Sequence, residues 1–170
     1  MDIPVYESFS DEDVVFEQFE KNTQRAGISH VIEPVLKTSA EAIQHIPSNI
    51  QLLFIDGAHE FEAVDMDYRL YAPKVIQNGF IAFHDTPWPG VQEVIQRVFI
   101  EDGFKNVYFT DCLMLGQKID HPTMWNKIKN RWMLDLSQSF QAACRSRQPK
   151  LIRKIWKDCI KLCRDIIYHI

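Results

Sequence analysis

The chain has 170 residues, of which 46% are hydrophobic and 25% are charged, and this balance predicts a folded chain with its own core rather than a disordered segment. No apolar run reaches the roughly 20 residues that a membrane-spanning helix needs, and the acidic amino-terminal residues lack the pattern of a secretory signal. We therefore expect a cytoplasmic protein whose four cysteines, none of them in a Cys-x-x-Cys pair, are reduced and packed.

The first third of the sequence predicts two helices and a strand. Ser10-Asp11-Glu12-Asp13 is typical of a helix N-terminus, and apolar residues at helical spacing extend the predicted helix over residues 11–26. Residues 31–36 are mostly apolar and predict a short strand. Ser39 is expected to cap a brief helix that ends before Pro47.

The middle of the sequence repeats a strand and helix pattern. Residues 51–56 predict a strand, and residues 60–71 predict a helix with one apolar face. Asn78-Gly79 predicts a turn that leads into a second strand over residues 80–84. A further amphipathic helix follows, with apolar residues Val91, Val94, Ile95 and Val98.

The pattern then changes to a hairpin, with strands predicted over residues 106–109 and 113–117. Strands that alternate with helices are typical of an α/β fold, so we expect a mostly parallel sheet with a carboxyl-terminal antiparallel hairpin. Residues 119–148 predict one or two helices that connect this domain to the end of the chain.

Two of the predicted strands end in an acid with a histidine close by. The first strand ends at Asp56, with His59 three residues later, and the second ends at His84, with Asp85 next. Neighbouring parallel strands place their carboxyl ends side by side, where open α/β folds bind their ligands. The sequence therefore predicts a cleft with two carboxylates and two imidazoles.

These residues also resemble a known family. Residues 55–64, Asp67 and residues 79–86 are similar to the IDGxHxYExVxxD and GGxIxxHDT signature of class I S-adenosylmethionine-dependent methyltransferases, in the macrocin O-methyltransferase-like group called methyltransferase family 24. The resemblance covers residues 9–118 and implies a Rossmann-like sheet with strand order 3-2-1-4-5-7-6.

The sequence departs from that family before residue 31. The strand, glycine-rich loop and acid-ending strand with which the family opens are not found, and none of the six glycines forms a Gly-x-Gly. We therefore expect an N-terminally truncated methyltransferase sheet. Residues 1–118 would be a partial class I methyltransferase domain, and residues 119–170 a basic helical extension.

The resemblance implies roles for five residues. Asp56 and Asp85 would bind Mg²⁺ together with His84, which stands where many relatives have a carboxylate, and His59 would be the catalytic base. Asp56 and Ser39 would contact the S-adenosylmethionine cofactor. Since histidine titrates near neutral pH, it suits the deprotonation of a sugar or phenol hydroxyl.

Structural roles stay open for the same residues. Each acid could only cap the helix that follows it, and His84 could be a core histidine. An imidazole at position 84 suits a softer ion than Mg²⁺, or no ion. Capping alone would explain Ser39.

The resemblance implies transfer of a methyl group from S-adenosylmethionine to a hydroxyl of a sugar or small molecule. The alternative is a non-catalytic methyltransferase-like remnant that acts as an interaction subunit. The missing glycine-rich loop favours the remnant, and the intact Asp-Gly-Ala-His and His-Asp-Thr sequences favour the enzyme.

The charge of the chain is distributed unevenly. Residues 121–170 contain 11 Lys and Arg against 3 Asp and Glu, a net charge of +8, which leaves 8 against 20, or −12, for residues 1–120. Residues 150–167 predict a basic amphipathic helix that packs on its own domain, joins two copies or binds an acidic protein, in preference to a membrane. Nucleic acid is not expected, since stacking aromatics are not interleaved with the basic residues.

Overall fold

The computed structural model describes residues 12–144 and Lys154. The chain divides into two compact units, residues 1–36 and residues 37–170, which are described separately. The basic amphipathic helix predicted over residues 150–167 lies outside the described residues, except for Lys154.

The first unit contains one long helix. Helix α1, Glu12–Arg25, confirms the helix predicted over residues 11–26, and a 3₁₀ helix follows at Ser29–Val31. The strand predicted over residues 31–36 is wrong, because these residues continue from the 3₁₀ helix without strand structure. Pro34 cannot donate a ladder hydrogen bond, and the described part of this unit contains no strand with which it could pair.

The second unit begins with the short helix α2, Ser39–Ala42. Thr38 is its N-cap, so the prediction that Ser39 caps this helix is wrong by one residue. The backbone N–H of Thr38 and its hydroxyl both donate to Glu41, at 3.2 and 2.8 Å. The hydroxyl has the larger effect in lowering the pKa of the Glu41 carboxyl.

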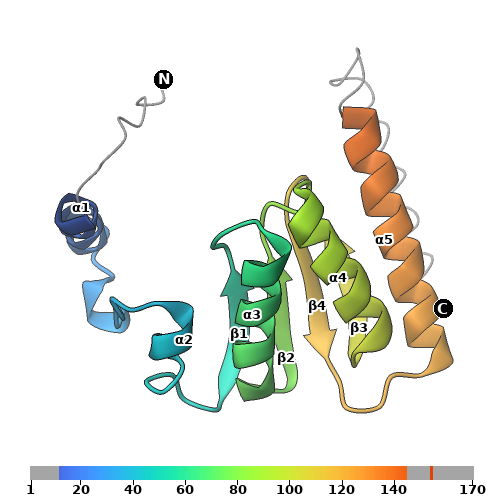
Figure 1. Ribbon diagram of the computed structural model, residues 1–170, viewed down its shortest axis with the longest axis horizontal. Helices are drawn as coiled ribbons and strands as arrows, with labels where there is room; N and C mark the ends of the chain where they lie inside the picture. Colours follow the sequence, from blue (N-terminus) through green and yellow to red (C-terminus); the bar gives the residue numbers. More distant parts are fainter. Residues whose placement is uncertain (1–11, 145–153, 155–170) are drawn as a thin grey trace. The chain divides into compact units, whose positions relative to one another are not determined.

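A four-stranded sheet forms the centre of the second unit, in the order β1-β2-β4-β3 (Figure 1). Strands β1 and β2 are parallel, whereas β4 runs antiparallel to both β2 and β3. This order corresponds to the last four strands, 4-5-7-6, of the order that the resemblance implies. The strands are β1 Ile50–Ile55, β2 Val75–Phe83, β3 Phe104–Phe109 and β4 Met114–Lys118.

The sheet is therefore less parallel than expected. Three strands run in one direction, but only β1 and β2 form a parallel ladder, and the other two ladders are antiparallel. The hairpin of β3 and β4 confirms the prediction for residues 106–117. Its last strand inserts beside β2 and so brings an antiparallel partner into the middle of the sheet.

The turn predicted at Asn78-Gly79 is part of β2 instead. This strand begins at Val75, and the irregularity at Asn78, with φ +63°, shifts its register against β1. A Cβ at Gly79 would lie 2.8 Å from a methyl group of Val75 and 3.1 Å from the carbonyl oxygen of Gln51. The pair therefore makes a bulge within the strand rather than a turn before it.

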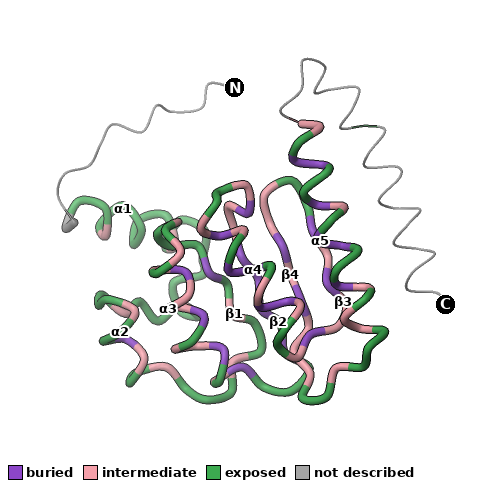
Figure 2. Tube along the Cα trace, turned by 45° about the vertical axis from the view of Figure 1, so that its right-hand side comes forward, coloured by how far each residue is buried: buried purple, intermediate pink, exposed green. Residues whose placement is uncertain are grey.

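Three helices, α3, α4 and α5, contribute to one core with the sheet (Figure 1). They are α3 Phe61–Tyr71, which continues as a 3₁₀ helix at Ala72–Lys74, α4 Pro89–Glu101 and α5 Met124–Cys144. Helices α3 and α4 confirm the helices predicted from the apolar spacing. Figure 2 shows the buried segments gathered on α4, α5 and the strands behind them. The core includes Ile55, Val64, Ile81, Phe83, Val94, Phe99, Met114 and Met133.

Among the described residues of this unit, no helix covers the opposite face of the sheet. Side chains alternate along a strand, so Leu53 and Ile55 of β1 meet the core while Leu52 and Phe54 point away from it. Leu52, Phe54 and Phe80 remain 57%, 49% and 36% exposed. Strand β1 is also the edge of the described sheet.

A buried amide connects helix α5 to α4 and to β3. The side chain of Asn130 donates to the carbonyl oxygens of Phe99 and Phe104, both at 2.9 Å, and only 1% of Asn130 is exposed. We expect Asn130→Ala to lower the free energy of unfolding by about 2–3 kcal/mol, because two buried carbonyls lose their donor. Urea denaturation measures this change. Gln138→Ala, an exposed site on the same helix, should change stability by less than about 0.5 kcal/mol, and equal effects would contradict the role of Asn130.

A partly buried ion network joins α3 to α4. Asp65 accepts hydrogen bonds from Arg97 and, at 2.7 Å, from Arg69. Burial raises the pKa of the Asp65 carboxyl, but the two arginines outweigh it and the net pKa is lowered. This carboxylate therefore stabilises the fold above the ordinary Asp value of 3.8, and the contribution is lost as the pH falls through the lower folded pKa.

We therefore expect Asp65→Asn to lower the unfolding temperature at pH 7, with a loss of about 1 kcal/mol in the free energy of unfolding. This loss should become smaller as the pH falls towards 3. Thermal unfolding across this pH range measures it. Asp135→Asn is the control, because Asp135 pairs with Arg131 while both side chains are more than half exposed. A loss for Asp65→Asn that does not depend on pH would contradict the network's role.

Candidate functional site

The ends of β1 and β2 lie side by side, as the spacing predicts. Ile55 is paired with Phe83 at the last position of the parallel ladder, and the N–H of His84 donates to the carbonyl oxygen of Ile55 at 3.0 Å. Asp56 and His84 are therefore the first residues beyond the two strands. Both reach the carboxyl edge of the sheet, the edge at which α/β proteins bind ligands.

Four predicted site residues come together at this edge. Nε2 of His59 lies 2.9 Å from a carboxylate oxygen of Asp85. Nδ1 of His84 lies 3.0 Å from Asp56 and 3.3 Å from Asp85. The side chains are 32–44% exposed, so solvent and small molecules can reach them. The structure thus brings the two carboxylates and the two imidazoles together at this edge of the sheet.

The loop after β2 is held in an unusual backbone conformation. Asp85 has φ +50°, which few residues other than glycine, asparagine and aspartate adopt. The N–H of Trp88 donates to the carbonyl of Asp85 at 3.0 Å, and the N–H of Thr86 donates to the carbonyl of Cys112 at 3.1 Å. These bonds fix the direction in which the Asp85 carboxylate leaves the strand.

A buried polar chain connects this loop to α5. Thr86 is 1% exposed, and its hydroxyl accepts a hydrogen bond from Gln141 at 2.9 Å. The side-chain oxygen of Gln141 accepts in turn from Gln92 at 2.7 Å. The sequence does not predict this connection, because Gln141 and its partner Thr86 lie 55 residues apart.

His59 is positioned by an aromatic neighbour and by a close backbone contact. Its ring stacks on that of Trp88, with centroids 4.9 Å apart and an angle of 11°. Trp88 immediately precedes α4, whose first residue is Pro89. A Cβ at Gly90 would lie only 2.4 Å from the carbonyl oxygen of His59, so glycine permits α4 to pack directly on the His59 backbone.

His84 has polar neighbours at both ring nitrogens. Nδ1 is buried and faces the two carboxylates, although neither contact is aligned as a hydrogen bond. Nε2 lies 3.3 Å from the sulfur of Cys112. A histidine between two acids and a thiol differs from a core histidine that is satisfied by backbone groups. Sequence reasoning missed Cys112, since a single cysteine in a hairpin turn carries no spacing signal.

The donor atoms fit a divalent cation. One ligand atom each from Asp56, His59 and Asp85 lie within 4.8 Å of one another, close enough for one ion about 2.0–2.4 Å from each. This group contains His59, whereas the predicted ligand set contained His84. Two carboxylates with an imidazole suit Mn²⁺, Fe²⁺ or Zn²⁺ as well as Mg²⁺.

Ser39 is not bonded to this cluster of acids and histidines among the described residues. Its carbonyl oxygen accepts a hydrogen bond from the hydroxyl of Tyr71 at 2.7 Å, which ties α2 to α3. Among the described residues, no hydrogen bond or ion pair joins Ser39 to the acids or histidines. Its expected contact with a cofactor stays a prediction.

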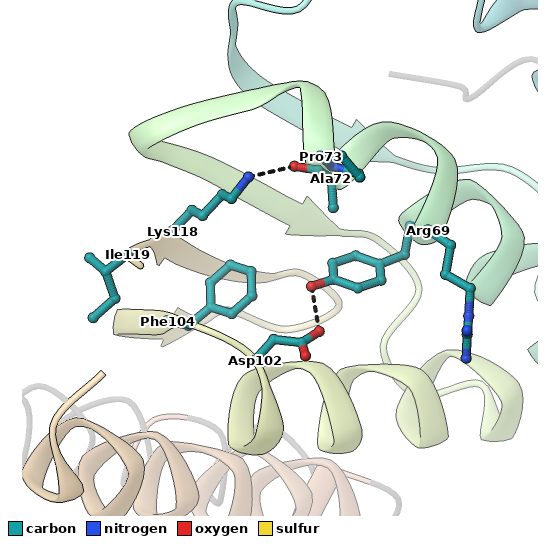
Figure 3. A pocket seen from close by; sticks show the side chains of 9 residues that line it. Arg69, Ala72, Pro73, Asp102, Phe104, Lys118 and Ile119 are labelled. Carbon is teal, nitrogen blue, oxygen red and sulfur yellow. Dashed lines mark hydrogen bonds between the residues drawn. The ribbon is translucent and has the colours of Figure 1, made fainter. Parts of the chain in front are cut away.

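A separate shallow cavity of about 370 Å³ lies at the other end of the sheet, where β2 and β3 begin (Figure 3). The hydroxyl of Tyr68 donates to Asp102 at 2.6 Å, and burial, with this acid, raises the pKa of Tyr68 far above 10. The ammonium of Lys118 donates to the carbonyls of Ala72 and Val75, both at 2.8 Å. These polar groups are hydrogen-bonded within the protein, so a structural role explains their presence in the cavity.

Part of this chain is similar in sequence to known proteins. Residues 6–86 match a family model described as a methyltransferase domain. A curated protein, uncharacterized protein R132 of Acanthamoeba polyphaga mimivirus, is 34% identical over 65 residues, which are 38% of this chain and 26% of that protein. The chain thus matches about a quarter of the length of that relative. None of the described helices is long and apolar enough to cross a membrane. The segment that matches a methyltransferase family therefore contains all four clustered residues, Asp56, His59, His84 and Asp85.

Proposed function

We propose that this chain contributes the acceptor side of an S-adenosylmethionine-dependent O-methyltransferase site, which methylates a hydroxyl of a sugar or small molecule. The observation that carries the proposal is the group of two acids and two histidines at the ends of β1 and β2, within the segment that matches a methyltransferase domain. Because one fold can host many functions, it is this group of side chains, rather than the fold, that supports a methyl transfer site.

His59 is the proposed base. Its Nε2 faces Asp85 at 2.9 Å, and we assign the ring proton to that nitrogen, which leaves the lone pair on Nδ1. Nδ1 then accepts the proton of the acceptor hydroxyl. Asp85 stabilises the positive charge that forms on the ring, and the Trp88 stack holds the ring in place.

Asp56 and Asp85 are the proposed ligands of a divalent cation. When bound, such a cation would lower the pKa of a hydroxyl that it contacts and fix its position. His59 belongs to the same group of donor atoms, so it cannot hold a cation through its lone pair and accept a proton with it at once. Because His84 lies 3.0 and 3.3 Å from the two carboxylates, it can limit their charge repulsion in the absence of an ion.

Trp88 is the proposed platform for the acceptor. Its side chain is 54% exposed even though one face stacks on His59. A flat exposed indole beside a base can receive the apolar face of a sugar ring or an aromatic ring. Because His59 occupies one face of the indole, an acceptor would contact the edge or the other face of Trp88, and its hydroxyl would reach His59 past the indole edge.

The cofactor supplies the methyl group. The resemblance assigns its contacts to Asp56 and Ser39, and the sequence offers no Gly-x-Gly loop beside them. The described residues therefore fit the acceptor side better than the cofactor side. A second chain or further residues would complete the site.

Calorimetric titration with S-adenosylmethionine, with and without Mg²⁺ or Mn²⁺, tests the proposal on the full chain. Micromolar binding would support it and justify a screen of hydroxylated acceptors for methyl transfer. No binding at millimolar cofactor would overturn it for the isolated chain.

The open face of the sheet favours a second candidate, a non-catalytic interaction subunit. Leu52 and Phe54 on the edge strand β1 are about half exposed, and edge strands with exposed apolar residues are typical sites of pairing. This candidate predicts no cofactor binding and a stable complex that Phe54→Lys disrupts. Analytical ultracentrifugation of the two forms distinguishes it from the enzyme.

A further inference from the structure

The outward face of α5 carries a large exposed apolar patch that the proposed function does not use. The side of the helix that faces the sheet is buried at Asn130, Met133 and Leu134. The patch, on the outward side, consists of Met124, Trp125, Ile128 and Trp132, which are 74%, 56%, 46% and 56% exposed. Two half-exposed tryptophans seven residues apart are unusual on a surface that only meets water.

Basic residues border this patch. Lys127, Lys129 and Arg131 lie between its members along the helix, and the ammonium of Lys129 lies 5.8 Å above the ring of Trp125. Asp135 is the only acid in α5, and it pairs with Arg131. Residues 121–170 as a whole have 11 Lys and Arg against 3 Asp and Glu. The patch therefore combines apolar anchors with a positive charge.

This chemistry allows either a protein or a lipid surface as the partner, and the shape of the patch favours the lipid surface. It lies on the outward side of one helix, and none of its residues lines the cavity of about 370 Å³. A protein partner would have to supply a matching groove, whereas a lipid headgroup layer adapts to a convex helix. Tryptophan with lysine and arginine is the composition of helices that lie in the membrane interface.

We propose that the outward face of α5 binds the surface of an anionic lipid membrane. Trp125, Ile128 and Trp132 enter the boundary between headgroups and acyl chains, while Lys127, Lys129 and Arg131 contact the lipid phosphates. The helix lies parallel to the surface. The contact is peripheral.

Vesicle sedimentation of the full chain tests this proposal. The vesicles contain phosphatidylcholine, with or without about one third phosphatidylserine, and binding is expected only with the anionic lipid and to weaken with salt. Trp125→Ala with Trp132→Ala should weaken binding at least about tenfold. Met66→Ala is the control, because Met66 is an apolar residue of α3 that is 42% exposed, and this variant should bind as the unchanged chain does.

Tryptophan fluorescence locates the contact. In a Trp88→Phe and Trp156→Phe background, Trp125 and Trp132 are the only tryptophans, and a blue shift with anionic vesicles is expected. Absence of binding would overturn the proposal. Binding that survives the double Trp→Ala change would also overturn it, since the basic residues beyond α5 would then suffice. Self-association without lipid that this change abolishes would assign the patch to a second copy instead.

Discussion

His59→Gln is expected to lower the rate of methyl transfer by about 10²–10⁴, the usual contribution of a general base. Glutamine keeps the approximate volume of histidine and can still donate a hydrogen bond to Asp85, which lies 2.9 Å from Nε2 in the present structure. It cannot take the proton of an acceptor hydroxyl. Cofactor affinity should change less than about threefold, because the resemblance assigns no cofactor contact to this side chain.

The rate is measured by mass spectrometry of the methylated acceptor under single-turnover conditions, once the titration has established cofactor binding. His121→Gln is the matched control, since His121 is exposed in the segment between β4 and α5 and should leave the rate unchanged. Full turnover by His59→Gln would remove His59 from the role of base. Asp85 would then act mainly as a ligand of the cation.

The candidate site could be predicted because it depends on local signals that act in the same direction. Residues 52–55 are a short apolar run of strand composition, and the acid after the run marks the end of β1. Once β1 and β2 are parallel neighbours, the register brings Asp56 beside His84 without further information. The spacing of three residues from Asp56 to His59 allows the chain to turn back before α3 begins.

The errors occurred where a strand or cap depends on a partner that the sequence does not reveal. Residues 31–36 have strand composition, but strand structure needs a neighbouring ladder. Thr38 and Ser39 are equally suited to cap α2, and the reach of Glu41 back to Thr38 decides between them. The buried chain from Thr86 through Gln141 could not be foreseen, because it joins residues that only the packing of α5 brings together.

Asp85→Asn is expected to reduce the rate of methyl transfer at least about 100-fold and yet to leave the fold as stable as before, or up to about 1 kcal/mol more stable. Asp85 contacts both histidines and belongs to the group of donor atoms, so its charge serves the base and the cation together. The same charge lies close to the carboxylate of Asp56, and the amide removes that repulsion. Asparagine also tolerates the φ of +50° at this position.

Comparison with Asp85→Ala separates the effect of the carboxylate charge from that of the backbone conformation at this position. It removes the carboxylate as asparagine does, but alanine is strained at positive φ, so it should be about 1 kcal/mol less stable than Asp85→Asn. Urea denaturation gives both free energies of unfolding, and calorimetric titration with Mn²⁺ gives the loss of cation affinity. If Asp85→Asn destabilised the chain as much as Asp85→Ala, the carboxylate would be holding the loop after β2. If cation affinity were also unchanged, Asp85 would be a structural residue. A stable asparagine variant that has lost both cation binding and turnover would instead mean that this loop keeps an unfavourable charge for the sake of the reaction.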